Sequence, residues 1–268
     1  MKSKLPEILY EDDYVFVFNK PAGLMVHPDG RTKETTLSDM LAKKYPELIT
    51  VGEPQKVKSD TDDNEDTDMT PQDAALIARP GIVHRLDTDT TGVLVVAKTQ
   101  ESFLHLKQQF LEHTVTKVYN AFVYGHPKKE FGTIEAAIGR SGKDFRAYSA
   151  QRGARGEKKE AVTMFRVLNR FMDENLSDEW KRFSFMELRP KTGRTHQLRV
   201  HMKYMHHPIV SDPLYAKEAP VALGFMRTAL HARSIAFTPP DGILQTVEAP
   251  YPDDFAQALQ EYVFHAKV

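Results

Sequence analysis

The stretch HRLDTDTTG, residues 84–92, runs directly into the apolar segment VLVVAK, residues 93–98, and this junction decides how the chain folds. The second segment is short, apolar and rich in valine, which is typical of a buried strand. Asp87 therefore lies in a polar segment, beside Arg85, that leads straight into the core. A carboxylate held near an arginine stays ionised and can act as a nucleophile.

The same junction also permits a purely structural interpretation. An aspartate near a turn often hydrogen-bonds the local backbone, so Asp87 could simply be a turn residue. Asp89 and Thr90 are better placed for that role. His84 either shapes the loop or contacts a ligand, and the sequence does not separate the two.

The rest of the chain alternates strands with irregularly placed helices. Strands are predicted at residues 14–18, 115–125, 133–138, 161–168, 183–189 and 231–237, in addition to the one beginning at residue 93. Helices are predicted at residues 36–45, 100–113, after 191–193 and at 253–265. This order indicates an α+β fold with a long mixed, mainly antiparallel sheet and flanking helices rather than a regular βαβ array.

Charge is segregated along the chain. Residues 52–73 carry a net charge of −6 within a total of −1, so the remainder carries +5. Residues 140–159 alone also carry +5. We expect a flexible acidic insert at about 52–73 and a basic surface that includes Arg152, Arg155 and Lys158, although a solvated basic loop would show the same pattern.

Several classes of protein are excluded or disfavoured by composition. The chain has no cysteine, which removes disulfides and thiolate zinc sites. No stretch approaches the ~18 apolar residues of a membrane helix, and the N-terminus lacks the apolar core of a signal peptide. We therefore expect a cytoplasmic protein. A metal-dependent hydrolase using His201, His206 and His207 stays a second alternative, although their spacing fits no ligand motif.

The segment TGRTHQLRVH, residues 192–201, concentrates cationic and polar groups at the start of the third predicted helix. Leu198, Met202 and Met205 should face inward. Arg199 lies one position away from this apolar face, so we expect it to be partly buried and paired with a carboxylate. The helix start is also suited to binding a phosphate.

Tyr119 is a third candidate, on the strand predicted at residues 115–125. We expect this strand to lie beside the one that begins at Val93. A tyrosine on a strand is more often a core residue than a catalytic one.

Five ordered blocks resemble RluA-type pseudouridine synthases across nearly the whole chain. They are KPAGLMVHP at 20–28, HRLDTDTTG at 84–92, KVY at 117–119, GRTHQLRVH at 193–201 and LHA at 230–232. The chain departs mildly from the family pattern at two positions. Thr91 precedes Gly92 where serine is commoner, and Ser211 precedes Asp212 where glycine is commoner. Neither change affects the proposed catalytic groups.

The resemblance implies a pseudouridine synthase fold with a central RNA-binding cleft, in one catalytic domain over residues 1–268. It also implies Asp87 as nucleophile, Tyr119 against the target uracil and Arg199 as ion-pair partner of Asp87. For Arg85 it implies a position in the gap left by the flipped nucleotide. The predicted RNA-binding residues also include His84, three residues at the helix start and three in the basic stretch, namely Arg194, His196, Gln197, Arg152, Arg155 and Lys158.

No cofactor or metal is implied, and we expect a monomer. The chain begins the catalytic fold without room for a small S4-type RNA-binding domain, which favours tRNA or a short stem-loop over rRNA as the substrate. A protein that has kept the fold as an inactive RNA-binding module is the main alternative.

Overall fold

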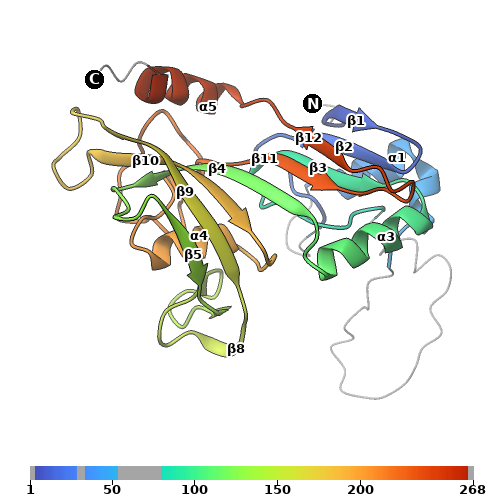
Figure 1. Cartoon of the computed structure of the whole chain (residues 1–268), viewed down its shortest axis with the longest axis horizontal. Coiled ribbons are helices and arrows are strands. Elements are labelled where there is room, and N and C mark those ends of the chain that lie inside the picture. The colour runs from blue at the N-terminus through green and yellow to red at the C-terminus, as the bar shows by residue number, and fades with distance from the viewer. Residues whose placement is uncertain (1–3, 29–33, 54–79, 265–268) are drawn as a thin grey trace.

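The computed structural model describes residues 4–28, 34–53 and 80–264 (Figure 1). All but the first two residues of the predicted acidic insert lie outside this part of the chain, so the prediction of flexibility at 52–73 is not addressed by it.

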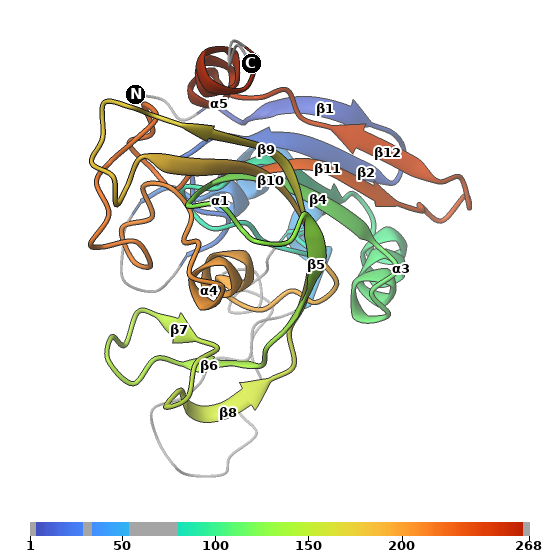
Figure 2. The same ribbon diagram turned by 60° about the vertical axis from the view of Figure 1, so that its left-hand side comes forward.

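A long β-sheet runs through the whole molecule (Figures 1 and 2). Within the described residues it has nine strands in the order β1-β2-β3-β11-β4-β10-β9-β5, with β12 paired to β11. The strands are β1 (Glu7–Glu11), β2 (Val15–Lys20), β3 (Thr91–Ala97), β4 (Thr116–Tyr124), β5 (Phe131–Glu135), β9 (Val162–Met172), β10 (Arg182–Pro190), β11 (Leu230–Phe237) and β12 (Gln245–Glu248). Only β3 and β11 pair in parallel. The predicted α+β class with a mixed, mainly antiparallel sheet is confirmed.

The apolar run that follows the opening motif becomes β3, and all seven of its residues are buried. Gly92, the second residue of this strand, lies opposite Ala232 of β11. Its φ is +111°, and a Cβ atom there would lie 2.1 Å from the carbonyl oxygen of Ala232. Only glycine tolerates this close approach of two backbones.

The predicted neighbour relation of Tyr119 is wrong. Its strand, β4, is separated from β3 by β11, which pairs with both. Sequence proximity suggested direct pairing, but the C-terminal strand is inserted between them. Tyr119 nevertheless packs against both large apolar clusters, including the one that contains β3.

Helices cover the sheet at the predicted places. They are α1 (Leu37–Lys44), followed by the 3-10 turn η1 (Pro46–Thr50), then α3 (Gln100–Leu111), α4 (Gln197–Tyr204), α5 (Asp253–Ala258) and the π-helical turn η2 (Leu259–Phe264). Thr36 and Thr99 cap α1 and α3 through their side chains. No helix in the described part of the chain is long and apolar enough to cross a membrane.

The interior divides into two large apolar clusters. One gathers β1, β2, β3, α1 and α3, and the other gathers β4, β9, β10, α4 and α5. β11 contributes to both, with Leu230 in the second cluster and Ile235 in the first. The sheet is therefore continuous, but the apolar core beneath it is divided into two halves, one for each cluster. The two halves meet at β11, and we call this boundary the seam.

A small separate sheet lies beyond α4 (Figure 2). It consists of β6 (Ile138–Arg140), β7 (Tyr148–Ser149) and β8 (Arg155–Lys159). Eight residues of the basic segment 140–159 belong to these strands, and the others form turns and loops. A third apolar cluster joins this sheet to Val200 and Tyr215. α4 is consequently enclosed on two sides, which buries residues that its apolar face alone would not cover.

Candidate active site

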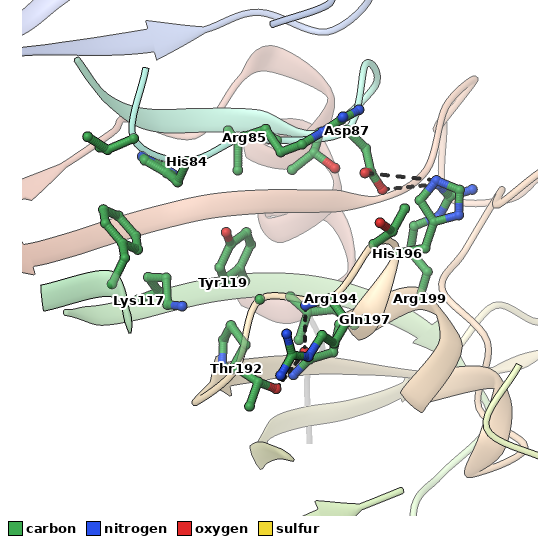
Figure 3. A pocket seen from close by; sticks show the side chains of 18 of the residues that line it. His84, Arg85, Asp87, Lys117, Tyr119, Thr192, Arg194, His196, Gln197 and Arg199 are labelled. Carbon is green, nitrogen blue, oxygen red and sulfur yellow. Dashed lines mark hydrogen bonds and ion pairs between the residues drawn. The ribbon is translucent and has the colours of Figure 1, made fainter. Parts of the chain in front are cut away.

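A cavity of about 580 Å³ opens at the seam between the two halves (Figure 3). Its walls come from the segment before β3, the end of α3, β4 and the loop between β10 and α4. This volume is within the usual range for ligand sites, roughly 300–1,000 Å³. Eight of the eleven predicted site residues line it.

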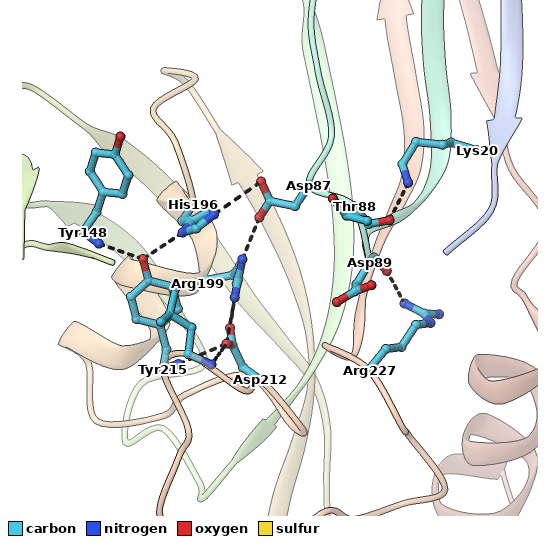
Figure 4. A network of polar contacts seen from close by, with 11 residues as sticks. Lys20, Asp87, Thr88, Asp89, Tyr148, His196, Arg199, Asp212, Tyr215 and Arg227 are labelled. Carbon is cyan, nitrogen blue, oxygen red and sulfur yellow. Dashed lines mark hydrogen bonds and ion pairs between the residues drawn. The ribbon is translucent and has the colours of Figure 1, made fainter. Parts of the chain in front are cut away.

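Asp87 lies on a pinned loop rather than on a regular element. Its carbonyl oxygen accepts the Thr90 N–H at 3.1 Å, which closes a turn. The next carbonyl, that of Thr88, accepts the buried Lys20 ammonium at 2.7 Å and the Gly23 N–H at 3.0 Å (Figure 4). The turn that was predicted around Asp89 and Thr90 is present, and it leaves the Asp87 side chain free to face the cavity.

Arg199 joins Asp87 to a second carboxylate. Its Nη1 donates to Asp87 Oδ2 at 3.1 Å, while Nε and Nη2 donate to Asp212 at 2.7 and 2.9 Å (Figure 4). Asp212 is fully buried and also accepts two backbone N–H groups. The guanidinium is thus held by a bidentate pair and presents its remaining edge to Asp87.

The burial of Arg199 is greater than predicted. Only 8% of the residue is exposed, because the small sheet covers the side of α4 that lies away from the main core. Burial by itself would lower the pKa of Arg199, but the hydrogen bonds and charges of Asp212 and Asp87 raise it. The cation is therefore permanent.

His196 completes the surroundings of Asp87. Its Nε2 lies 3.9 Å from Asp87 Oδ1, and its Nδ1 lies 2.9 Å from the Tyr215 hydroxyl. That hydroxyl accepts the Tyr148 N–H at 3.0 Å, so its own proton is available for Nδ1. This pattern favours the tautomer with the proton on Nε2, directed at Asp87. Burial lowers the pKa of His196, which favours the neutral ring.

Tyr119 lines the same cavity from β4, with its ring rising toward the loop of Arg85 and Asp87 (Figure 3). Burial and the nearby Asp87 charge raise the pKa of its hydroxyl. The hydroxyl is therefore protonated at neutral pH. The three predicted catalytic residues Asp87, Tyr119 and Arg199 come together at one site.

His84 and Arg85 take different positions in the wall. His84 Nε2 accepts the Val95 N–H at 2.9 Å, and the ring stacks on Phe110 at 4.9 Å. Burial lowers the pKa of His84 to about 3. These contacts favour a loop-shaping role. Arg85 is exposed at the cavity, where its Nη1 lies 3.0 Å from His27 Nε2.

Gln197 and Arg194 shape the start of α4. The Gln197 amide donates to the Val162 carbonyl and to Thr163 Oγ1, and its oxygen accepts from Thr192 and from the Arg194 N–H. With these bonds the amide is fully used by the protein, which favours a structural role over the predicted RNA contact. Arg194 lines the cavity and remains available at its terminal nitrogens, since only Nε donates to the Glu160 carbonyl.

The basic residues Arg152, Arg155 and Lys158 do not line the cavity. All three are exposed on or beside β8 of the small sheet. The structure does not bring them to Asp87, so any role they have in binding is at a distance from the chemistry.

Two of the three histidines of the alternative metal site, His201 and His207, contact oxygens of the protein. Both ring nitrogens of His201 contact oxygens, Thr163 Oγ1 at 2.9 Å and the Ala136 carbonyl at 3.0 Å. His207 Nδ1 faces the Tyr124 carbonyl. Within the ranges that the structure describes, no three histidines or acids are grouped as metal ligands.

Sequence reasoning missed four residues of the network. Asp212 and Tyr215 attracted attention only as part of a block that departs from the resembled family, and no role was assigned to Lys20 or Tyr148. The signal for Asp212 was its place in that block. Local pattern alone could not show that it meets Arg199, because thirteen residues separate them.

Comparisons with known proteins show which family the chain resembles. A model described as RNA pseudouridylate synthase matches residues 14–204. An uncharacterised RNA pseudouridine synthase of Bacillus subtilis (strain 168) is 37% identical over 256 residues, which cover 95% of this chain and 72% of that protein. The ribosomal large subunit pseudouridine synthase D of Pseudomonas aeruginosa is 36% identical over 265 residues, which cover 94% of this chain and 70% of that protein.

A solved structure shares the fold as well. The structure of human RNA pseudouridylate synthase domain containing 1 has a TM-score of 0.64 at 26% identity, covering 94% of this chain and 84% of that one.

Proposed function

The chain belongs to the RNA pseudouridylate synthase family, a family of isomerases, and from this premise we propose that it converts uridine to pseudouridine in structured RNA with Asp87 as nucleophile. The observation that carries the proposal is the ion pair between Asp87 and Arg199 at 3.1 Å, in a cavity that also holds Tyr119.

The proposed reaction breaks the N1–C1′ bond of a uridine, turns the base and rejoins it to C1′ through C5. The base must first leave its stack, which costs a few kcal/mol. The Asp87 carboxylate then either attacks the nucleoside or removes a ribose proton, and Arg199 supports both routes by keeping the carboxylate charged and oriented. No redox step is involved.

Tyr119 has two properties that suit the uracil. Its ring offers a face on which the base can stack, and its protonated hydroxyl can take part in moving the proton that leaves C5. Arg85, on the exposed side of the cavity, is placed to fill the gap that a flipped nucleotide leaves in the RNA. His196 directs a neutral N–H at Asp87.

We propose the RNA of the large ribosomal subunit as the first substrate to test. Similar proteins are named for that subunit. The second candidate substrate is tRNA or a short stem-loop, which the sequence favoured. The sequence also leads us to propose that the protein works in the cytoplasm as a monomer.

Tritium release from RNA labelled at C5 of uridine tests the reaction. Wild-type protein should release tritium from ribosomal RNA or tRNA, and Asp87→Asn should release none while binding the same RNA with similar affinity. Asp89→Asn, which removes a charge two residues away on the same loop, is the matched control and should keep most of the activity.

Absence of release from any cellular RNA with wild-type protein would favour the alternative, an RNA-binding protein without catalysis. Turnover by Asp87→Asn at the wild-type rate would refute the nucleophile assignment.

A further inference from the structure

The cavity continues past Tyr119 toward α3, and this end contains groups that the proposed reaction does not use. Lys117 precedes Tyr119 by two positions on β4, so both side chains lie on one face of the strand, about 7 Å apart along it. Figure 3 shows both in the cavity. The facing walls come from Phe110 on α3 and from Arg194 in the loop before α4.

Lys117 differs in its partners from Arg199 and Lys107, two other cations that line the cavity. Arg199 is paired with two aspartates, and the Lys107 ammonium is paired with Glu53. In the described part of the chain, no carboxylate or carbonyl oxygen accepts a hydrogen bond from Lys117, whose ammonium lies 5.8 Å from the centre of the Phe110 ring.

This ammonium is also largely removed from water. Burial lowers the pKa of Lys117 to about 8, and no acidic neighbour among the described residues raises it. A desolvated charge without a partner is costly, and an anion that arrives with a ligand would remove that cost. Among the described residues that line the cavity, Asp87 is the one carboxylate, and it is paired with Arg199 rather than with Lys117.

We propose that this end of the cavity is a second subsite, in which Lys117 binds the phosphodiester group of a nucleotide adjacent to the uridine being isomerised. The proposal rests on the proposed function, because RNA is the ligand that brings a backbone phosphate next to a base held on Tyr119. A phosphate would give the Lys117 ammonium a partner with a full negative charge. A neutral base carbonyl would not.

The aromatic wall of the subsite is fixed in the free protein. Phe110 and His84 are stacked with an angle of 23° between their rings, and His84 is held by the Val95 N–H. A nucleotide entering this end therefore meets a preformed surface, and Lys117 is the residue that decides whether its charge is accepted.

Salt-dependent binding tests the subsite without chemistry. A fluorescein-labelled RNA hairpin with a uridine-rich loop is titrated with protein that carries Asp87→Asn. Adding Lys117→Met should weaken binding about tenfold and reduce the slope of log Kd against log salt by about 0.7 to 0.9, the value of one phosphate contact. Lys117→Arg should restore both. Lys98→Met is the control, since Lys98 is paired with Glu11 outside the cavity.

Neutral methylphosphonates, placed one at a time around the loop of the hairpin, identify the phosphate. At one position the replacement should weaken binding to the Asp87→Asn protein about tenfold and have no further effect when Lys117→Met is also present. An unchanged salt slope in Lys117→Met, or equal sensitivity to every methylphosphonate in both proteins, would overturn the subsite.

Thermal unfolding of the RNA-free protein tests the premise. Lys117→Met should melt at a higher temperature than wild type, because it removes an unpaired charge, whereas a lower melting temperature would contradict the premise. The subsite and the reaction can fail separately. Methylphosphonate coupling without tritium release would refute the reaction alone, and tritium release without coupling would refute the subsite alone.

Discussion

The base of the cavity and the small sheet both contain cationic side chains, but they hold them in different ways. Arg199 is buried, and its three donating nitrogens are all directed at carboxylates. Arg152, Arg155 and Lys158 are exposed on or beside β8. A buried cation with a fixed position can orient one partner atom, as Arg199 does for an oxygen of Asp87. Exposed cations attract an anionic ligand through a field that salt screens. Substitutions in the two regions should therefore differ in size and in salt dependence.

The largest effect is expected where the network is most buried. Asp212→Asn leaves Arg199 without its bidentate partner, and disruption of a buried pair costs about 3 kcal/mol or more of the free energy of unfolding. Because the guanidinium can then shift, turnover should also fall by about 100-fold.

Denaturant unfolding and tritium release measure these two effects of Asp212→Asn. Glu248→Gln, which removes an exposed ion pair with Arg233, is the control and should change neither quantity appreciably. Equal destabilisation by the two substitutions would contradict the prediction that the buried network of Arg199 contributes more stability than an exposed ion pair.

Acid should weaken the cavity before it affects the small sheet. Burial lowers the pKa of His84 to about 3 and that of His231 to about 4. As the pH falls below about 6.5, the unfolded chain takes up protons that these rings cannot, so each contributes a loss of about 1.4 kcal/mol per pH unit down to its folded pKa.

Denaturant midpoints measured between pH 7 and 4.5 test this dependence. His84→Gln should make the loss of stability with falling pH less steep, by the contribution of one histidine. His105, which is exposed on α3, is the matched position, and His105→Gln should leave the curve as it is. A wild-type protein whose stability is constant over this range would contradict the prediction.

Tyr215→Phe tests how closely the two regions are connected. The substitution removes the hydroxyl that accepts the Tyr148 N–H of β7 and faces His196. We expect turnover to fall about tenfold, equivalent to roughly 1.4 kcal/mol, and its pH profile to move because the His196 tautomer is no longer fixed.

Tyr204→Phe, at the exposed end of α4, is the control for Tyr215→Phe and should behave as wild type. An unchanged pH profile in Tyr215→Phe would show that the hydroxyl only packs.

The smallest effect per residue is expected on the small sheet. Replacing Arg152, Arg155 and Lys158 together by glutamine should weaken RNA affinity about fivefold and flatten its salt dependence, with the rate constant for turnover unchanged. Titrations at several salt concentrations measure both quantities. A salt slope equal to that of wild type would leave this surface without an electrostatic role.

The sequence predicts some parts of this structure better than others for physical reasons. β3 is recognisable because an unbroken apolar run is sufficient to define a buried strand, and Gly92 marks its start. The position of β11 between β3 and β4 has no local signal, because it follows from pairing between segments more than a hundred residues apart.

The site shows the same contrast. The ordered motifs brought Asp87, Tyr119 and Arg199 to attention, and the structure gathers them in one cavity. The burial of Arg199 was underestimated because helical periodicity considers one apolar face, whereas the small sheet covers another side of α4. Asp212 was not assigned a role because a carboxylate in a loop gives no indication of its partner.

The placement of β11 also has a consequence for how the protein is made. This strand completes both halves of the core, yet it lies in the last fifth of the chain. During synthesis from the N-terminus, β3 and β4 must wait with unpaired edges until β11 emerges, and such edges are prone to aggregate. We therefore expect the nascent chain to be most prone to aggregation until β11 has emerged and paired with both strands.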